Sequence, residues 1–94
     1  MIRSVRLTPG ADRDLLRLVD FLVEKSPRSA VRAGDAIERG IRSLAQLAER
    51  GRQAPIEGAR EIVVAFGRNA YVIQYRIAED EVVVARIFHS LEHR

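Results

Sequence analysis

The spacing of apolar residues changes once along this chain of 94 residues. Up to about residue 50, apolar residues recur every three or four positions, which is the spacing of amphipathic helices. From residue 61 they alternate with polar residues or form short runs rich in valine and isoleucine, which is typical of strands. The pattern therefore predicts a helical first half and a β-rich second half.

Two hydroxyl residues, Thr8 and Ser26, each stand directly before a proline. A hydroxyl can accept a hydrogen bond from the free amides of a helix's first turn, and proline fits the first helical position. We therefore predict one helix over residues 9–25 and a second from residue 27 to shortly before Gly51, where glycine favours a left-handed C-cap. The apolar stripes of these helices are Leu15, Leu18, Val19 and Leu22 in the first and Ala30, Ala33, Ile37, Ile41, Leu44 and Ala48 in the second.

A tight turn joins the two helices, which should form a hairpin followed by a loop over residues 52–59. Small residues in the second helix, including Gly34 and Gly40, lower its helix propensity. We expect them to let the two helices approach each other closely. The apolar stripes of this hairpin need a sheet to cover them, and the second half of the chain supplies one.

Four strands are predicted. Residues 2–7 show a weak alternation that suits a short edge strand, and residues 61–66, 71–77 and 82–89 form three β-rich runs. Segments of hairpin length separate these runs, so they should form an antiparallel meander. Residues 1–94 then make a single α+β domain of order β-α-α-β-β-β, in which a helix hairpin covers one face of a small antiparallel sheet and the other face is open.

The last hairpin leaves two registers open, because the length of its loop decides which face each side chain takes. With an even number of loop residues, two groups of side chains each share a face. These groups are Tyr71, Ile73 and Tyr75 with Val84, Arg86 and Phe88, and Gln74 and Arg76 with Ala85, Ile87 and His89. One residue more or less in the loop exchanges the groups, but either register gathers arginine, tyrosine and histidine on one small sheet.

Composition places the chain among globular proteins, with 47% hydrophobic and 31% charged residues and a net charge of +3. Lysine occurs once, at Lys25, and the other basic residues are all arginine. Cysteine is absent, which excludes disulfides and thiolate metal sites. No apolar run has the length of a signal peptide or a membrane span, so we expect a cytoplasmic protein that does not contact a membrane.

The sheet offers a basic, partly aromatic surface that suits a phosphate backbone or an acidic protein partner. The candidates for such contacts are Arg60, Arg68, Tyr71, Tyr75, Arg76, Arg86, Phe88 and His89. The alternative is structural: the tyrosines are ordinary strand residues with half-buried rings, and the arginines lie over apolar neighbours or pair with carboxylates. The residues themselves leave both interpretations open for Arg76 and Arg86 and favour the structural one for Tyr71.

Chemistry within the chain has few candidates. His89 suits proton transfer near neutral pH, and it equally suits a structural role at the end of a strand. His89 and His93 are spaced to share a metal only on a helix, and no third ligand is evident, so we expect neither a metal nor a cofactor. No glycine-rich phosphate loop or serine–histidine–aspartate arrangement occurs, which argues against a nucleotide-binding or hydrolytic enzyme.

Five segments are distinctive in combination: Arg3–Leu15, Ser26–Ala30, Arg60–Val64, Tyr71–Ile77 and Val82–His89. Together they resemble the ParE/RelE superfamily of small bacterial toxins. This resemblance spans nearly the whole chain and repeats the same order of elements. It implies the toxin of a type II toxin–antitoxin module, neutralised by a cognate antitoxin that is encoded by the adjacent gene and wraps a groove of the toxin.

Two activities occur in this superfamily. RelE-like members are ribonucleases that cut mRNA on the ribosome, and the residues here that match such a site are Arg76, Arg86 and His89. The YoeB-like branch has an arginine where this chain has Val72 and a closing tyrosine where it has Ser90, and Lys25 is badly placed for lysine-based catalysis. These departures argue against nuclease activity.

ParE-like members lack the nuclease residues and poison DNA gyrase by protein contact, so the resemblance favours a gyrase-binding inhibitor. An inactive family member that serves as an interaction module is a further alternative. A DNA-binding regulator is a third class, but the long second helix carries Asp35 and Glu38, unlike a recognition helix. We therefore expect direct nucleic-acid binding to be weak or absent, and the free protein to expose an apolar surface for its antitoxin.

Overall fold

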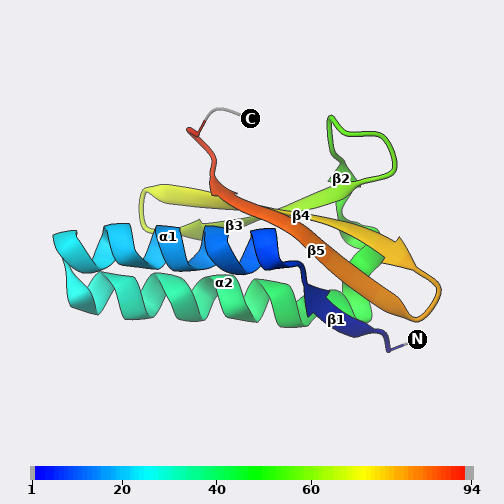
Figure 1. Ribbon diagram of the computed structural model, residues 1–94, viewed down its shortest axis with the longest axis horizontal. Coiled ribbons are helices and arrows are strands. Elements are labelled where there is room, and N and C mark those ends of the chain that lie inside the picture. The colour runs from blue at the N-terminus through cyan, green and yellow to red at the C-terminus, as the bar shows by residue number, and fades with distance from the viewer. Residues whose placement is uncertain (1, 93–94) are drawn as a thin grey trace.

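In the computed structural model, which describes residues 2–92, two antiparallel helices cover one face of a five-stranded sheet (Figure 1). The elements in chain order are β1 (Ser4–Leu7), α1 (Pro9–Lys25), α2 (Pro27–Leu47), the short 3-10 helix η1 (Ala48–Arg50), β2 (Arg52–Gln53), β3 (Arg60–Phe66), β4 (Asn69–Ala78) and β5 (Glu81–His89). The α+β class and the helix hairpin on one face of the sheet are as predicted.

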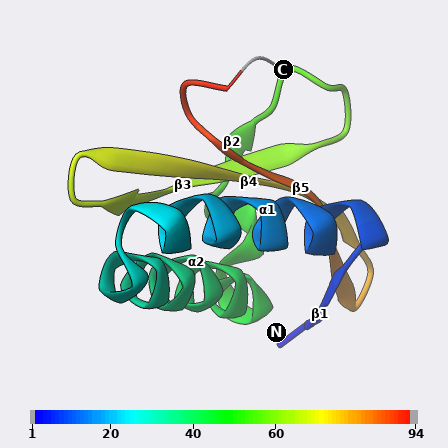
Figure 2. The same ribbon diagram turned by 60° about the vertical axis from the view of Figure 1, so that its left-hand side comes forward.

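Both predicted helix starts are confirmed. The Thr8 side chain accepts a hydrogen bond from the Ala11 amide at 3.1 Å, and the Ser26 side chain accepts one from the Ser29 amide at 3.3 Å. Ser26 also ends α1, because its amide donates to the Leu22 carbonyl at 2.7 Å. One residue therefore closes the first helix and opens the second, which makes the turn so tight that the helices run side by side (Figure 2).

The core lies between the helix hairpin and the sheet. The whole predicted stripe of α2 is buried, whereas in α1 Leu18 is buried and Leu15 and Leu22 are partly buried. Tyr71, Ile73 and Tyr75 of β4 supply the largest buried side chains on the sheet side. The prediction of which helix residues face the sheet is therefore confirmed most fully for α2.

The predicted left-handed cap at Gly51 is wrong. Gly51 has an extended conformation, with φ −67° and ψ 143°, which any residue can adopt. The position needs glycine for a different reason: a Cβ there would overlap the hydroxyl of Tyr75, which donates a hydrogen bond to the Ala48 carbonyl. Gly51 therefore gives Tyr75 the space to tie β4 to the end of the helix hairpin.

The small residues of α2 were expected to let the two helices approach each other closely, but the closest approach is between α2 and the sheet. A Cβ at Gly40 would be 2.6 Å from Val64 Cγ2 and 3.3 Å from Ile73 Cδ1, so this glycine brings α2 close to the sheet. A Cβ at Gly34 would be 3.7 Å from Val19 Cγ2, which is ordinary contact between α2 and α1. The tight interface is therefore between helix and sheet.

The sheet has the order β1-β5-β4-β3-β2. Its last three long strands form the predicted antiparallel meander, whereas β1 pairs parallel to β5, so the sheet is mixed. The predicted loop contains a two-residue strand, β2, which pairs with the start of β3. β1 pairs only with residues 81–84 of β5. On the same side of β5, the backbone beyond residue 84 therefore lies next to α1 and not next to a strand.

The register of the last hairpin combines both alternatives. The loop of two residues, 79–80, is even, and Tyr75 pairs with Val84 as expected for that case. A β-bulge between Gln74 and Tyr75 then shifts the pairing, so that Ile73 pairs with Ile87. An extra residue in one strand reverses every face beyond it. His89 therefore pairs with Tyr71 on the helix side, and Arg86 pairs with Gln74.

We predict that Gly51→Ala lowers the free energy of unfolding by about 2 kcal/mol, since the added methyl group meets the Tyr75 hydroxyl. Gly34→Ala is the matched control and should raise stability by about 0.5–1 kcal/mol, because it adds helix propensity without a clash. Urea denaturation measures both. Combining Gly51→Ala with Tyr75→Phe should cost less than the sum of the single changes, and full additivity would contradict this account.

Candidate functional site

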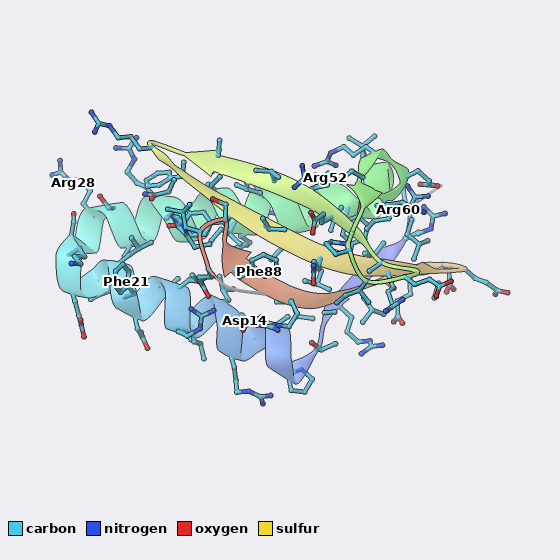
Figure 3. The ribbon with its side chains drawn as sticks, turned by 90° about the horizontal axis from the view of Figure 1, so that it is seen from above. Asp14, Phe21, Arg28, Arg52, Arg60 and Phe88 are labelled. Atoms are coloured by element: carbon cyan, nitrogen blue, oxygen red, sulfur yellow. The ribbon has the colours of Figure 1, made fainter. Side chains whose placement is uncertain are left out.

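The carboxylate of Asp14 binds β5 on the side that faces β1, just beyond the residues that pair with β1. It accepts a hydrogen bond from the Ile87 amide at 2.9 Å and one from Arg86 Nε at 2.8 Å. Asp14 is only 8% exposed although it lies in the first half of α1, and Figure 3 shows it beside the sheet. The hydrogen bond and the negative charge of Asp14 raise the pKa of Arg86 above its ordinary value.

The start of α1 adds two more bonds to the bulged strand. The Thr8 amide donates to the Val84 carbonyl at 3.0 Å, and the Thr8 hydroxyl donates to the Ala85 carbonyl at 3.2 Å. Thr8 and Asp14 together therefore satisfy backbone groups on both sides of the bulge. The bulge is built into the junction of α1 and β5, and it decides where the side chains of residues 86–89 lie.

His89 has both ring nitrogens engaged. The Leu91 amide donates to Nδ1 at 3.1 Å, which makes Nδ1 an acceptor and places the ring proton on Nε2. Nε2 lies 3.0 Å from Asn69 Oδ1 and donates to it in that tautomer. The ring also meets Tyr71 edge to face at 5.4 Å between centroids. His89 thus holds the end of β5 against the β3–β4 hairpin.

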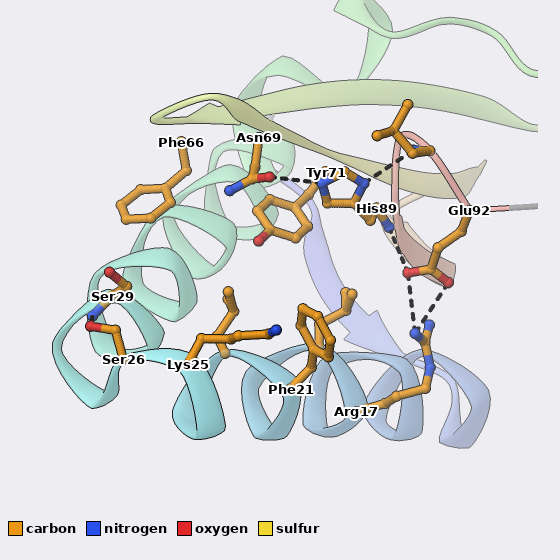
Figure 4. Close-up of a pocket in the computed structure, with 13 residues that line it drawn as sticks. Arg17, Phe21, Lys25, Ser26, Ser29, Phe66, Asn69, Tyr71, His89 and Glu92 are labelled. Atoms are coloured by element: carbon orange, nitrogen blue, oxygen red, sulfur yellow. Dashed lines mark hydrogen bonds and ion pairs between the residues drawn. The ribbon is translucent and has the colours of Figure 1, made fainter.

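An ion pair ties the turn after β5 to α1. Glu92 accepts a hydrogen bond from the His89 amide at 3.0 Å and is 3.1 Å from the Arg17 guanidinium. Partial burial opposes ionisation of Glu92, but the His89 amide and the Arg17 charge outweigh it and hold its pKa below the usual value. We call the contacts among Arg17, His89 and Glu92 the C-terminal latch (Figure 4).

A groove of 860 Å³ opens between α1 and the end of the sheet (Figure 4). Its walls are mainly apolar, from Leu18, Phe21 and Leu22 of α1 and from Phe66 and Tyr71 of the sheet. The Phe21 side chain is 59% exposed although it belongs to this wall. The C-terminal latch closes one end, and Lys25 lies on the α1 wall toward the other end (Figure 4). This groove is an apolar surface of the kind expected on the free protein.

The other candidate residues lie apart from the groove or within the structural framework. Arg60 donates to the carbonyls of Glu49 and Gly51, at 2.9 Å and 3.1 Å, and so caps the end of the helix hairpin. Arg76 is exposed and donates to the Glu57 carbonyl at 3.0 Å. Arg68 is exposed in the β3–β4 turn.

The aromatic candidates are all buried. Tyr71, Tyr75 and Phe88 are 1%, 0% and 5% exposed, and burial raises the pKa of both tyrosines. Tyr71 reaches the groove wall, and Tyr75 lies in the core. Alternation along β4 places Arg76 on the face turned away from the helices, whereas the bulge turns His89 toward them. The candidates therefore do not form one cluster.

Sequence reasoning missed Asp14, Phe21 and Glu92 as parts of this region. An acidic residue such as Asp14 near the positive start of a helix needs no further explanation in the sequence, and its bond to β5 depends on a strand distant in the sequence. Phe21 gave a usable signal, since it is a large aromatic residue off the predicted stripe of its helix. Glu92 gave no such signal in the sequence, because it meets Arg17 only when α1 packs along β5.

Residues 2–92 contain no group of three or more histidine, cysteine or acidic side chains that could hold a metal ion. His93, the other half of the considered histidine pair, lies outside the described residues. No helix in the described part of the chain is long and apolar enough to cross a membrane.

Comparisons with known proteins agree on one family. The profile described as "ParE toxin of type II toxin-antitoxin system, parDE" matches residues 5–93. Toxin RelE3 of Caulobacter vibrioides is 45% identical over 99% of this chain and 100% of its own length. Toxin RelE1 of the same organism is 43% identical over the full length of both chains.

Two solved structures share the fold. A chain of the chromosomal ParDE system from P. aeruginosa superposes with a TM-score of 0.78 at 25% identity, covering 94% of this chain and 96% of that one. A chain of the toxin–antitoxin complex RelBE2 from Mycobacterium tuberculosis has a TM-score of 0.64 at 26% identity, covering 98% of this chain and 95% of that one.

We predict that Asp14→Ala lowers the free energy of unfolding by about 2 kcal/mol, because the buried Ile87 amide loses its acceptor. Asp14→Asn retains an acceptor oxygen and should cost about half as much. Asp12→Ala, in the exposed first turn of the same helix, is the control and should change stability by less than about 0.5 kcal/mol. Equal losses from Asp12→Ala and Asp14→Ala in urea denaturation would disprove the role of the β5 edge.

The C-terminal latch predicts a pH dependence. The folded pKa of Glu92 is below its ordinary value of 4.5, so its stabilisation is complete above that pH and is lost as pH falls below it. The stability difference between wild type and Glu92→Gln should therefore shrink as the pH falls below about 5. Glu24→Gln, at an exposed position of α1, is the control. A difference independent of pH, measured by thermal unfolding, would count against the latch.

Proposed function

The chain belongs to the ParE/RelE superfamily of type II toxin–antitoxin toxins, and within that superfamily we propose that it acts as a ParE-like inhibitor of DNA gyrase through protein contact. The match to the ParE profile spans residues 5–93 and favours this branch. The proposal does not require a catalytic site, only a folded surface that gyrase can bind.

The arrangement of the three nuclease candidates is the observation that carries this proposal. A ribonuclease of the RelE type needs a proton donor and acceptor together with cations on the phosphate. His89 uses both ring nitrogens within the fold, and Arg86 is paired with Asp14. Arg76 lies on the opposite face of the sheet from His89. These groups do not face a common substrate position, so binding fits better than catalysis.

The antitoxin would occupy the groove beside α1. The two structural neighbours come from a ParDE system and a RelBE2 toxin–antitoxin complex, which supports a cognate antitoxin for this chain. The groove exposes Phe21 and is otherwise lined mostly by apolar side chains, which suits an amphipathic segment of a partner. We expect that partner to be encoded by the adjacent gene.

Gyrase contact is assigned to the exposed arginines of the sheet and its turns. Arg68 and Arg76 are exposed, although Arg76 donates one hydrogen bond to the Glu57 carbonyl. Arg60 is half-buried and is held by two carbonyl groups of the framework. The planar guanidinium group binds carboxylates and phosphates through two hydrogen bonds, so it suits an acidic or phosphate-rich surface of the gyrase–DNA complex. Arg68 and Arg76 are therefore the residues to change first.

The alternative is a ribosome-dependent mRNA endoribonuclease. The names of the Caulobacter vibrioides relatives, RelE1 and RelE3, favour it. In that case Arg76, Arg86 and His89 would be the residues to examine, and the contacts of His89 with Leu91 and Asn69 would have to open for the ring to exchange a proton.

Induced expression separates the two activities. We expect growth arrest, accumulation of covalent gyrase–DNA cleavage complexes, and intact bulk mRNA. The double variant Arg68→Ala, Arg76→Ala should require at least about tenfold more inducer for the same arrest, if each arginine contributes about 1 kcal/mol of contact energy. Arg42→Ala is the matched control, because Arg42 pairs with Glu38 on the exposed side of α2.

Rapid cleavage of mRNA within translated codons, with gyrase unaffected, would replace this proposal with the nuclease alternative. Loss of toxicity in Arg42→Ala equal to that in the double variant would remove the assignment of the contact surface. Absence of arrest at an expression level confirmed by immunoblotting would point to an inactive family member.

A further inference from the structure

Charge is distributed unevenly along the groove. Its lining residues include three charged side chains: Arg17, Lys25 and Glu92. Arg17 and Glu92 lie 3.1 Å apart in the C-terminal latch, so they neutralise each other at one end. Lys25 lies toward the other end (Figure 4) and is exposed, and among residues 2–92 no acidic group is within ion-pair distance of it.

The cationic end is held against aromatic rings. Lys25 Nζ lies 5.3 Å from the centre of the Phe21 ring, and Arg32 Cζ lies 6.0 Å from the centre of the Phe66 ring. Both rings line the groove. A cation over an aromatic face keeps its position without losing its charge, so it remains available to an incoming carboxylate. The groove thus has an apolar floor, one neutral end and one cationic end.

We propose that the groove selects an acidic amphipathic segment of the antitoxin in one orientation, with Lys25 as the specificity-determining residue. Large apolar side chains of the segment lie on Leu18, Leu22 and Tyr71, and a carboxylate lies at the Lys25 end. The opposite orientation brings that carboxylate to the neutral Arg17–Glu92 end, where it gains no such attraction. This inference rests on the proposed binding of an antitoxin in the groove and adds the partner's charge and direction.

The size and exposure of the groove agree with such an occupant. A volume of 860 Å³ is near the upper end of the range for ligand sites, which is enough for several side chains of a peptide. Phe21 lies at the rim of the groove and is 59% exposed, so its aromatic ring is accessible to a binding partner. Lys25 is also the one lysine of the chain, so its substitution removes the only ammonium group carried by a side chain.

The test measures binding of the purified product of the adjacent gene to the full-length toxin by isothermal titration calorimetry. Lys25→Glu should weaken binding about tenfold or more, since reversal converts attraction to repulsion. Arg39→Glu, an exposed reversal on α2 that does not line the groove, should weaken it by less than about twofold. Equal melting temperatures of the variants establish that both fold.

A complementary reversal in the partner identifies the carboxylate. Each acidic residue of the antitoxin's toxin-binding segment is changed to lysine, and one of these changes should restore binding to Lys25→Glu while weakening binding to wild type. Binding to wild type should also fall more steeply with added salt than binding to Lys25→Gln, because a surface charge pair is screened.

The possible failures are distinguishable. If the adjacent gene's product binds wild type and both Lys25→Glu and Arg39→Glu equally well, the charge selection is wrong and antitoxin binding stands. If that product does not bind wild type, the proposed antitoxin and this inference both fail. If the free toxin is a dimer that Phe21→Glu dissociates, a second copy occupies the groove and the inference is overturned.

Discussion

The hydrogen bond from the Ile87 amide to the Asp14 carboxylate is the interaction on which the rest of the site depends. It fixes α1 along the half of β5 that β1 leaves unpaired, and it lies just beyond the bulge that sets the register of the last hairpin. Without the bulge, the even loop would turn His89 away from the helices. The groove would then lose the ring that joins β5 to the β3–β4 hairpin.

Two tethers define the depth of this groove. At one end of the hairpin, Tyr75 binds the Ala48 carbonyl through the space that Gly51 leaves open, and so holds the end of α2 against the sheet. Midway along α1, the C-terminal latch binds that helix to the turn after β5. The helices are thus fixed where they are close to the sheet, while the Lys25 end of α1 remains free to form a wall that exposes Phe21.

Local patterns were sufficient to predict the elements of the fold but not how the strands meet. The capping hydroxyls Thr8 and Ser26 and the stripe of α2 act within a few residues of themselves, so the sequence identified them. The bulge depends on bonds from Thr8 and Asp14 to a strand more than 70 residues away, as the separations of 73 and 77 residues show. The role of Gly51 was misjudged for the same reason, since Tyr75 arrives from β4. The sequence predicted the residue types of the candidate site but not where they meet. The groove forms from α1, the start of α2, the β3–β4 turn and the end of β5, which are far apart in the sequence.

The position of β5 between β1 and β4 also bears on the order in which the chain can fold. β5 follows the other strands in the sequence, yet it joins the first strand to the rest of the sheet and supplies most of the contacts of α1 with that sheet. A nascent chain that has not yet released residues 81–89 from the ribosome has no edge to which α1 can attach and no closed groove. Contacts of such long sequence separation form late. A chain with this topology acquires its groove only after residues 81–89 have left the ribosome, so no partner can bind the completed groove before that point.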